Sequence, residues 1–127
     1  MKTAATVAAA LIAVVALFQI ALALGAPMGS AAWGGQNPGR LPTGLRVASG
    51  IVGILVYPIL VVLVLEAGGV IDLDRVPDLG STGMWVVTGL FTLGVMANLV
   101  SRSKPERIWA PVSLVIAICC GIVASGL

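Results

Sequence analysis

The stretch that decides the fold is Gly25 to Arg46, which reads GAPMGSAAWGGQNPGRLPTGLR. Glycine and proline are too frequent here for a continuous helix, because glycine favours turns with positive φ and proline lacks a backbone N–H. We therefore predict a long irregular loop, and a loop of this length is usually functional or disordered. On both sides of it the chain reads as apolar helix.

The composition indicates a chain that lies in lipid. Of its 127 residues, 59% are hydrophobic and 9% are charged, and the mean hydropathy is +1.12. An average soluble domain has about 25% charged residues. No polar block is left for a soluble domain, so we expect one transmembrane domain over residues 1–127, an all-α four-helix bundle. Its helices are expected at about 3–24, 44–66, 84–100 and 104–126.

The first apolar run, Thr3 to Leu24, has about the length needed to cross the hydrocarbon core, with Gln19 as its polar exception. A secretory signal peptide is the alternative, because Lys2 precedes the run and small residues at 21–23 could be cleaved. The run exceeds the usual apolar core of a signal peptide, so we favour a retained helix.

In the second apolar run, Thr43 is the expected N-cap and Pro58 is expected to kink the helix. Ser49, Gly53 and Tyr57 follow one another at intervals of four residues, so they share a helix face. We expect that face to pack inward.

The fourth helix is predicted to begin near Lys104. Ser103 and Glu106 have the S-x-x-E spacing of a capping box, in which each side chain satisfies a backbone N–H of the first turn. Pro105 would fall in that first turn, where its missing N–H is harmless.

Basic residues fall unevenly between the two ends of such a bundle. The first and third connections carry five of the seven Lys and Arg side chains, namely Arg40, Arg46, Arg102, Lys104 and Arg107. The positive-inside rule then places this end in the cytoplasm and both termini outside, although Lys2 argues for the opposite orientation.

The sequence has few of the side chains that enzymes use for catalysis. The chain has no histidine, the commonest general base and zinc ligand, and its adjacent Cys119 and Cys120 match no redox or metal motif. Asp72, Asp74 and Asp78 could attract a hard cation or serve a lipid-headgroup enzyme, but they lack the rest of an EF-hand, so we expect a solvated acidic loop. We expect no enzymatic activity, no cofactor and no metal site.

Three polar side chains in or beside apolar runs are candidates for function. If the second helix stops at Leu65, Glu66 marks the membrane interface; if it continues through Ile71, Glu66 becomes a proton-coupling or cation-binding candidate. Gln19 and Asn98 are expected to join helices by hydrogen bonds.

The first loop supplies the other candidates, Trp33, Arg40 and Arg46. It could form an interfacial cover, with Trp33 at the membrane surface and the two arginines facing lipid phosphates. Alternatively, the uncharged residues 26–35 could form a re-entrant lid that dips into the bundle. The loop lacks the G-x-x-x-x-G-K-[ST] pattern of a nucleotide-binding loop.

Several short motifs stand out in the sequence: LGAPMG at 24–29, AWGG at 32–35, LP at 41–42, LRVAS at 45–49, and NLVS-x-S-x-x-ER at 98–107. With these motifs, over nearly its whole length, the chain resembles an uncharacterised family of small four-helix bacterial integral membrane proteins. The resemblance implies the fold and the bacterial cytoplasmic (inner) membrane. It implies no activity, ligand or catalytic residue.

Two functions remain open. The first is a structural or accessory bundle that interacts with membrane lipids, as a homo-oligomer or beside another membrane protein, with no nucleic-acid partner. The second is a small transporter or channel that uses Glu66, Asn98 and Gln19. A transport path needs these groups to converge on one hydrated cavity, whereas an accessory bundle leaves them at separate helix contacts.

Overall fold

Four helical segments, each long and apolar enough to cross a membrane, make up a computed structural model that describes residues 1–127. Helix α1 is Lys2–Ala23, and the second segment joins α2 (Thr43–Ile51), the π-helical turn η3 (Val52–Val56) and α3 (Tyr57–Ala67). The third is α4 (Gly80–Leu99), and the fourth joins the 3-10 turn η4 (Glu106–Ile108) to α5 (Trp109–Gly126). The predicted all-α bundle is confirmed.

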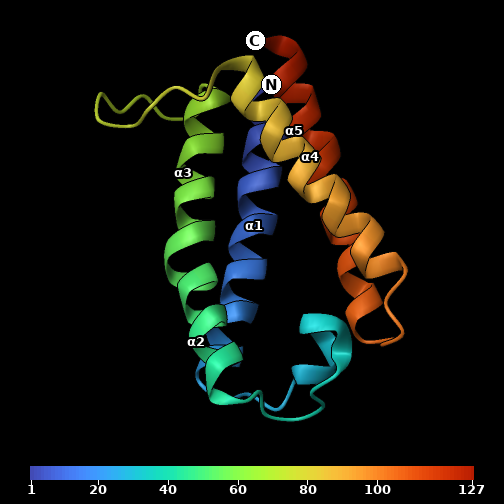
Figure 1. Cartoon of the computed structure of the whole chain (residues 1–127). Coiled ribbons are helices and arrows are strands. Elements are labelled where there is room, and N and C mark those ends of the chain that lie inside the picture. Colours follow the sequence, from blue (N-terminus) through green and yellow to red (C-terminus); the bar gives the residue numbers. More distant parts are fainter.

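The bundle consists of two helix pairs that diverge toward one end. Helix α1 packs along α3 and also contacts α5, while α4 and α5 pack along each other. Helices α3 and α4 touch only briefly, and Figure 1 shows the α4–α5 pair leaning away from α1 and α3 toward the first loop. The divergence leaves a space between α3 and α4.

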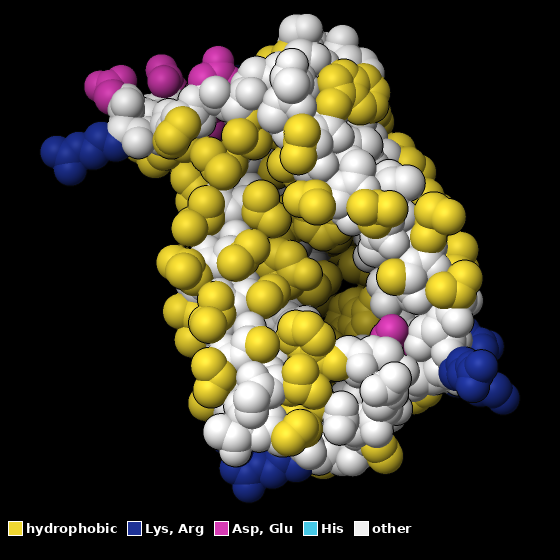
Figure 2. Space-filling model, viewed as in Figure 1, with side chains coloured by type: hydrophobic (Ala, Val, Ile, Leu, Met, Phe, Trp, Pro, Cys, Tyr) yellow, Lys and Arg dark blue, Asp and Glu magenta, His cyan; other side chains and the backbone are white.

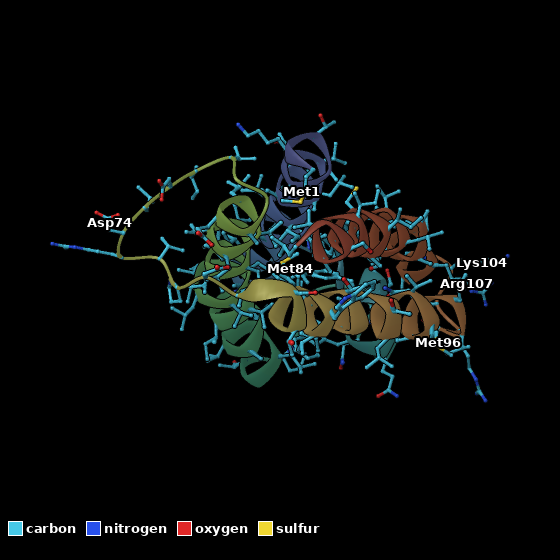
Figure 3. The ribbon with its side chains drawn as sticks, turned by 90° about the horizontal axis from the view of Figure 1, so that it is seen from above. Met1, Asp74, Met84, Met96, Lys104 and Arg107 are labelled. Carbon is cyan, nitrogen blue, oxygen red and sulfur yellow. The ribbon has the colours of Figure 1, made fainter.

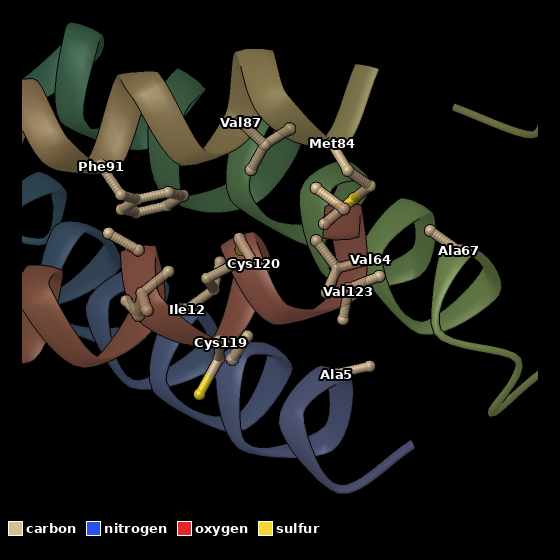
Figure 4. Packing of buried hydrophobic residues seen from close by; sticks show 14 residues of the cluster. Ala5, Ile12, Val64, Ala67, Met84, Val87, Phe91, Cys119, Cys120 and Val123 are labelled. Carbon is tan, nitrogen blue, oxygen red and sulfur yellow. The ribbon is translucent and has the colours of Figure 1, made fainter. Parts of the chain in front are cut away.

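The main core lies toward the end that carries both termini. There Ile12, Val64, Met84 and Cys120 are fully buried between α1, α3, α4 and α5 (Figure 4). Small residues let the helices approach closely. A Cβ atom on Gly53 of η3, for example, would lie 2.9 Å from the carbonyl oxygen of α1 residue 16.

The second helical segment is irregular in the turn before Pro58, as expected. Because Pro58 cannot donate a backbone hydrogen bond, the helix widens at η3, where the Tyr57 N–H donates to the Val52 carbonyl five residues earlier. Ser49 and Gly53 are buried and Tyr57 is half-buried. The inward-packing face predicted from these three residues is therefore confirmed.

Three predicted boundaries need correction. Pro42, not Thr43, is the N-cap of α2, and no side chain caps that helix. Helix α4 begins at Gly80, four residues early, because the Asp78 carboxylate accepts a hydrogen bond of 2.9 Å from the Gly80 N–H and starts the turn. Helix α5 begins at Trp109 after the η4 turn.

The two ends of the bundle differ in charge. Figure 1 shows both termini and the connection between α3 and α4 at one end, and the first loop and the third connection, residues 100–105, at the other. Seen from above in Figure 3, the connection that carries Asp74 extends well away from the helices. Asp72, Asp74 and Asp78 are exposed, and no three Asp, Glu, Cys or His side chains are arranged to hold a metal ion. Which end faces the cytoplasm stays a prediction.

A laterally open cleft as candidate functional site

The space between the diverging helix pairs is a cleft of about 490 Å³. Side chains of α1, η3, α3, α4 and α5 form its walls, and residues 31–34 of the first loop close one end. Figure 2 shows the molecule hollowed here between the α3 and α4 sides, with hydrophobic side chains inside the hollow and an acidic one at its edge. The cleft therefore opens sideways, toward the space that lipid occupies around a membrane bundle.

Aromatic side chains are concentrated in this cleft. The chain has six, and all but Trp85 line it: Phe18, Trp33, Tyr57, Phe91 and Trp109. The ring centroids of Phe18 and Trp109 are 4.6 Å apart, and those of Tyr57 and Phe91 are 6.5 Å apart in a stacked arrangement. Such rings offer both apolar area and negative π-faces to a ligand.

Four polar side chains also face the cleft: Gln19, Asn98, Glu106 and Ser113. The Glu106 side chain is buried, and its Oε2 atom has no hydrogen-bond partner. The Oε1 atom of Gln19 is likewise buried without a partner. Both unpartnered atoms are acceptors, and a buried acceptor without a donor typically destabilises a protein by about 1–3 kcal/mol.

Glu106 lines the cleft and takes no part in the predicted capping box. The Ser103 hydroxyl instead donates to the Ser30 carbonyl of the first loop, and the Ser103 N–H donates to Ser101 Oγ at 3.2 Å. No side chain caps η4. The capping-box prediction was thus wrong: the Ser103 N–H, from which the Glu106 carboxylate would accept a hydrogen bond, is bonded to Ser101 Oγ, and the Ser103 side chain is turned to the first loop.

The first loop folds against the bundle through specific hydrogen bonds. The Trp33 indole donates to Ser49 Oγ on α2 at 2.9 Å, and the Trp109 indole donates to the Ala31 carbonyl at 3.0 Å. The loop lies across one end of the bundle, and its residues 31–34 also line the cleft. Trp33 itself has a positive φ of 51°, an unfavourable conformation for a residue with a side chain, which these contacts hold in place.

The structure brings together three of the six residues that the sequence singled out, Gln19, Trp33 and Asn98. The arginines lie elsewhere: Arg40 is exposed, and Arg46 Nε donates to the Ala23 carbonyl at the end of α1 at 3.1 Å.

Glu66 lies in the last turn of α3, at the end of the bundle opposite the first loop. The helix neither stops at Leu65 nor reaches Ile71 but ends at Ala67. Glu66 is half-buried, and its Oε2 atom is buried without a partner. It does not line the cleft.

Sequence reasoning missed Glu106, Tyr57 and Trp109 as residues of a site. The sequence held one signal for Glu106. The other four carboxylates lie close together at residues 66–78, and Glu106 alone lies elsewhere in the chain. The S-x-x-E spacing gave Glu106 a local explanation as part of a capping box with Ser103, which concealed that signal.

The fold and the cleft together define a class: a multi-pass helical membrane protein with a laterally open, aromatic-rich cleft. Comparison with known proteins gives no matching family model, no matching curated protein and no matching solved structure.

Proposed function

We propose that this protein binds an amphipathic, lipid-like molecule in the cleft between α3 and α4, and that it does so without catalysis. The observation that carries the proposal is the convergence of five aromatic and four polar side chains on one cavity that opens sideways. A volume of about 490 Å³ is within the usual range of small-molecule sites, roughly 300–1,000 Å³.

The polarity of the cleft changes along the bundle in the way that an amphiphile requires. Gln19, Asn98 and Glu106 all lie near the helix ends that adjoin the first loop. Val15 lies about one turn further into α1 than Gln19, and Leu90 lies about two turns further into α4 than Asn98; both are apolar parts of the lining. A polar headgroup near the membrane surface and an apolar chain deeper in the bilayer would match this order.

A purely structural bundle explains the cleft less well. In such a bundle, Gln19 and Asn98 would bond across helix contacts, yet Gln19 Oε1 has no partner and both side chains line an open space. Buried polar groups in a membrane that lack partners are costly and commonly mark a site of function. A bound headgroup would supply the missing partners.

The test is native mass spectrometry of the full-length protein purified in detergent, with equal amounts of phosphatidylethanolamine and phosphatidylglycerol that carry identical acyl chains. Gly94 on α4 lines the cleft, and a Cβ there would make only ordinary contact with Ser113 at 3.5 Å. Gly94→Leu should therefore fill the cleft without breaking the bundle. Gly89→Leu is the matched control, because Gly89 is on the same helix and a Cβ there would have no neighbouring atom within 4 Å.

We expect the unaltered protein and Gly89→Leu to retain a lipid, and Gly94→Leu to retain about tenfold less, a difference of about 1.4 kcal/mol. Equal retention by all three proteins would refute binding in the cleft. Lipids that copurify with the protein, identified in the same spectra, would reveal the natural ligand.

Transport of the same molecule is a second candidate function, favoured by the convergence of Gln19 and Asn98 on one cavity. Glu66, which the sequence placed on the same path, is outside the cleft, so such a path would use Glu106 instead. Flux of the bound amphiphile across proteoliposomes, lost in Gly94→Leu, would support transport. We propose the bacterial cytoplasmic membrane as its location, because the family resemblance of its sequence implies it.

A further inference from the structure

We propose that Glu106 selects the ligand by charge, so that the cleft takes an amphipathic organic cation, an ammonium group attached to an apolar body. This inference rests on the proposed binding function and adds the chemical class of the ligand. It depends on the surroundings of one carboxylate.

Glu106 is 8% exposed, and its Oε2 atom has no partner in the protein. A carboxylate offers acceptors only, so no rotation of the side chain can turn the unpartnered atom into a donor. What the site lacks is therefore a donor or a positive charge. A buried acidic group of this kind is stable only when a partner compensates it.

The protein's own cations do not supply that charge in the cleft. No lysine or arginine is among the residues that line it. The nearest basic side chains along the chain, Arg102, Lys104 and Arg107, are exposed, and Arg107 Nε donates to the Ser101 carbonyl at 2.8 Å. The compensating group is left for a ligand to provide.

The remaining walls suit an organic cation rather than a bare metal ion. Trp33, Tyr57 and Trp109 line the same cleft as Glu106, and the faces of such rings attract ammonium groups. The cleft is also far larger than a metal ion, and no cluster of metal-ligating side chains is present. Carboxylate, aromatic rings and an apolar extension together fit an alkylammonium compound.

Two sources could provide this chemistry, the ammonium headgroup of a membrane lipid or a free lipophilic amine. The experiment separates them with two pairs of probes, each added to the full-length protein in native mass spectrometry. The first pair is phosphatidylethanolamine against phosphatidylglycerol. The second is dodecyltrimethylammonium against dodecyldimethylamine oxide, which has the same tail length but no net charge at pH 8.

The key variant is Glu106→Gln, which keeps the size of the side chain and removes its charge. The matched control is Glu66→Gln, because Glu66 also has a buried, unpartnered oxygen but lies outside the cleft. Loss of an unpartnered buried carboxylate should leave thermal stability unchanged or raised, so both variants are expected to fold.

In the unaltered protein and in Glu66→Gln, we expect the ammonium-bearing member of at least one pair, phosphatidylethanolamine or dodecyltrimethylammonium, to bind about tenfold tighter than its partner. In Glu106→Gln, the two members should bind within about twofold of each other. Preference within the lipid pair identifies a lipid headgroup as the ligand, and preference within the detergent pair alone identifies a free amine.

Two results would overturn the inference. The first is a preference for the ammonium-bearing probe that survives in Glu106→Gln, and the second is the absence of any such preference in the unaltered protein. If probes bind without charge preference but Gly94→Leu still excludes them, the charge selection fails while the proposed binding function stands. If Gly94→Leu excludes no probe, the binding function itself fails.

Discussion

The contact between the first loop and the third connection can be tested with two neighbouring glycines. Gly34 and Gly35 have φ angles of +79° and +71°, as expected for a turn-rich loop, so alanine is strained at either position. Their surroundings differ. A Cβ on Gly34 would have Gln36 Cγ at 3.9 Å as its nearest neighbour, whereas a Cβ on Gly35 would overlap the Cβ of Ser103.

The expected free energies follow from this difference. Gly34→Ala should destabilise the protein by about 1–2 kcal/mol, the cost of a left-handed conformation for a residue with a Cβ. Gly35→Ala bears the same cost and adds overpacking of about 1–3 kcal/mol. It also disturbs the Ser103 to Ser30 hydrogen bond, worth about 1 kcal/mol. We therefore expect a total of about 3–6 kcal/mol for Gly35→Ala.

The assay is thermal or denaturant unfolding of each variant in one detergent, followed by tryptophan fluorescence. Ser103→Gly in the Gly35→Ala background removes the overlapping Cβ and should recover part of the lost stability, a coupling of about 1 kcal/mol or more. The reasoning would be refuted if Gly35→Ala were no more destabilising than Gly34→Ala. Unchanged stability in both would mean that the loop is loose.

Four further results are expected. Gly53→Leu should destabilise the bundle by about 1–3 kcal/mol through overpacking against α1, visible as a lower unfolding temperature. Trp33→Phe should lower the free energy of unfolding by about 1 kcal/mol, because the indole can no longer donate to Ser49 Oγ. A double-mutant cycle with Ser49→Ala should then show coupling between the two positions. Glu66→Gln should elute as folded protein in size-exclusion chromatography, and aggregation would mean that Glu66 has a buried partner. A cytoplasm-specific reporter fused to Leu127 should stay inactive if the basic end is cytoplasmic, and strong activity would reverse that orientation.

The sequence alone was enough to predict the four helices, because an apolar run in lipid must satisfy its backbone hydrogen bonds within itself. The same logic located the first loop, where glycine and proline make helix unfavourable from Gly25 onward. The inward face of Ser49 and Gly53 followed from helical periodicity, which depends only on neighbouring positions along one helix.

The tertiary structure decided which polar groups meet. Gln19, Asn98 and Glu106 come from three segments, and periodicity gives the face of each helix but not its neighbour or its tilt. Glu106 faces the cleft and forms no local cap: the Ser103 hydroxyl donates to Ser30, 73 positions away, and the Ser103 N–H donates to Ser101 Oγ. Glu66 lies far from the cleft's polar residues, because it is in the last turn of α3 at the opposite end of the bundle. Local patterns list the bonds that a side chain can make, and only the packed chain determines which of the competing partners is within reach.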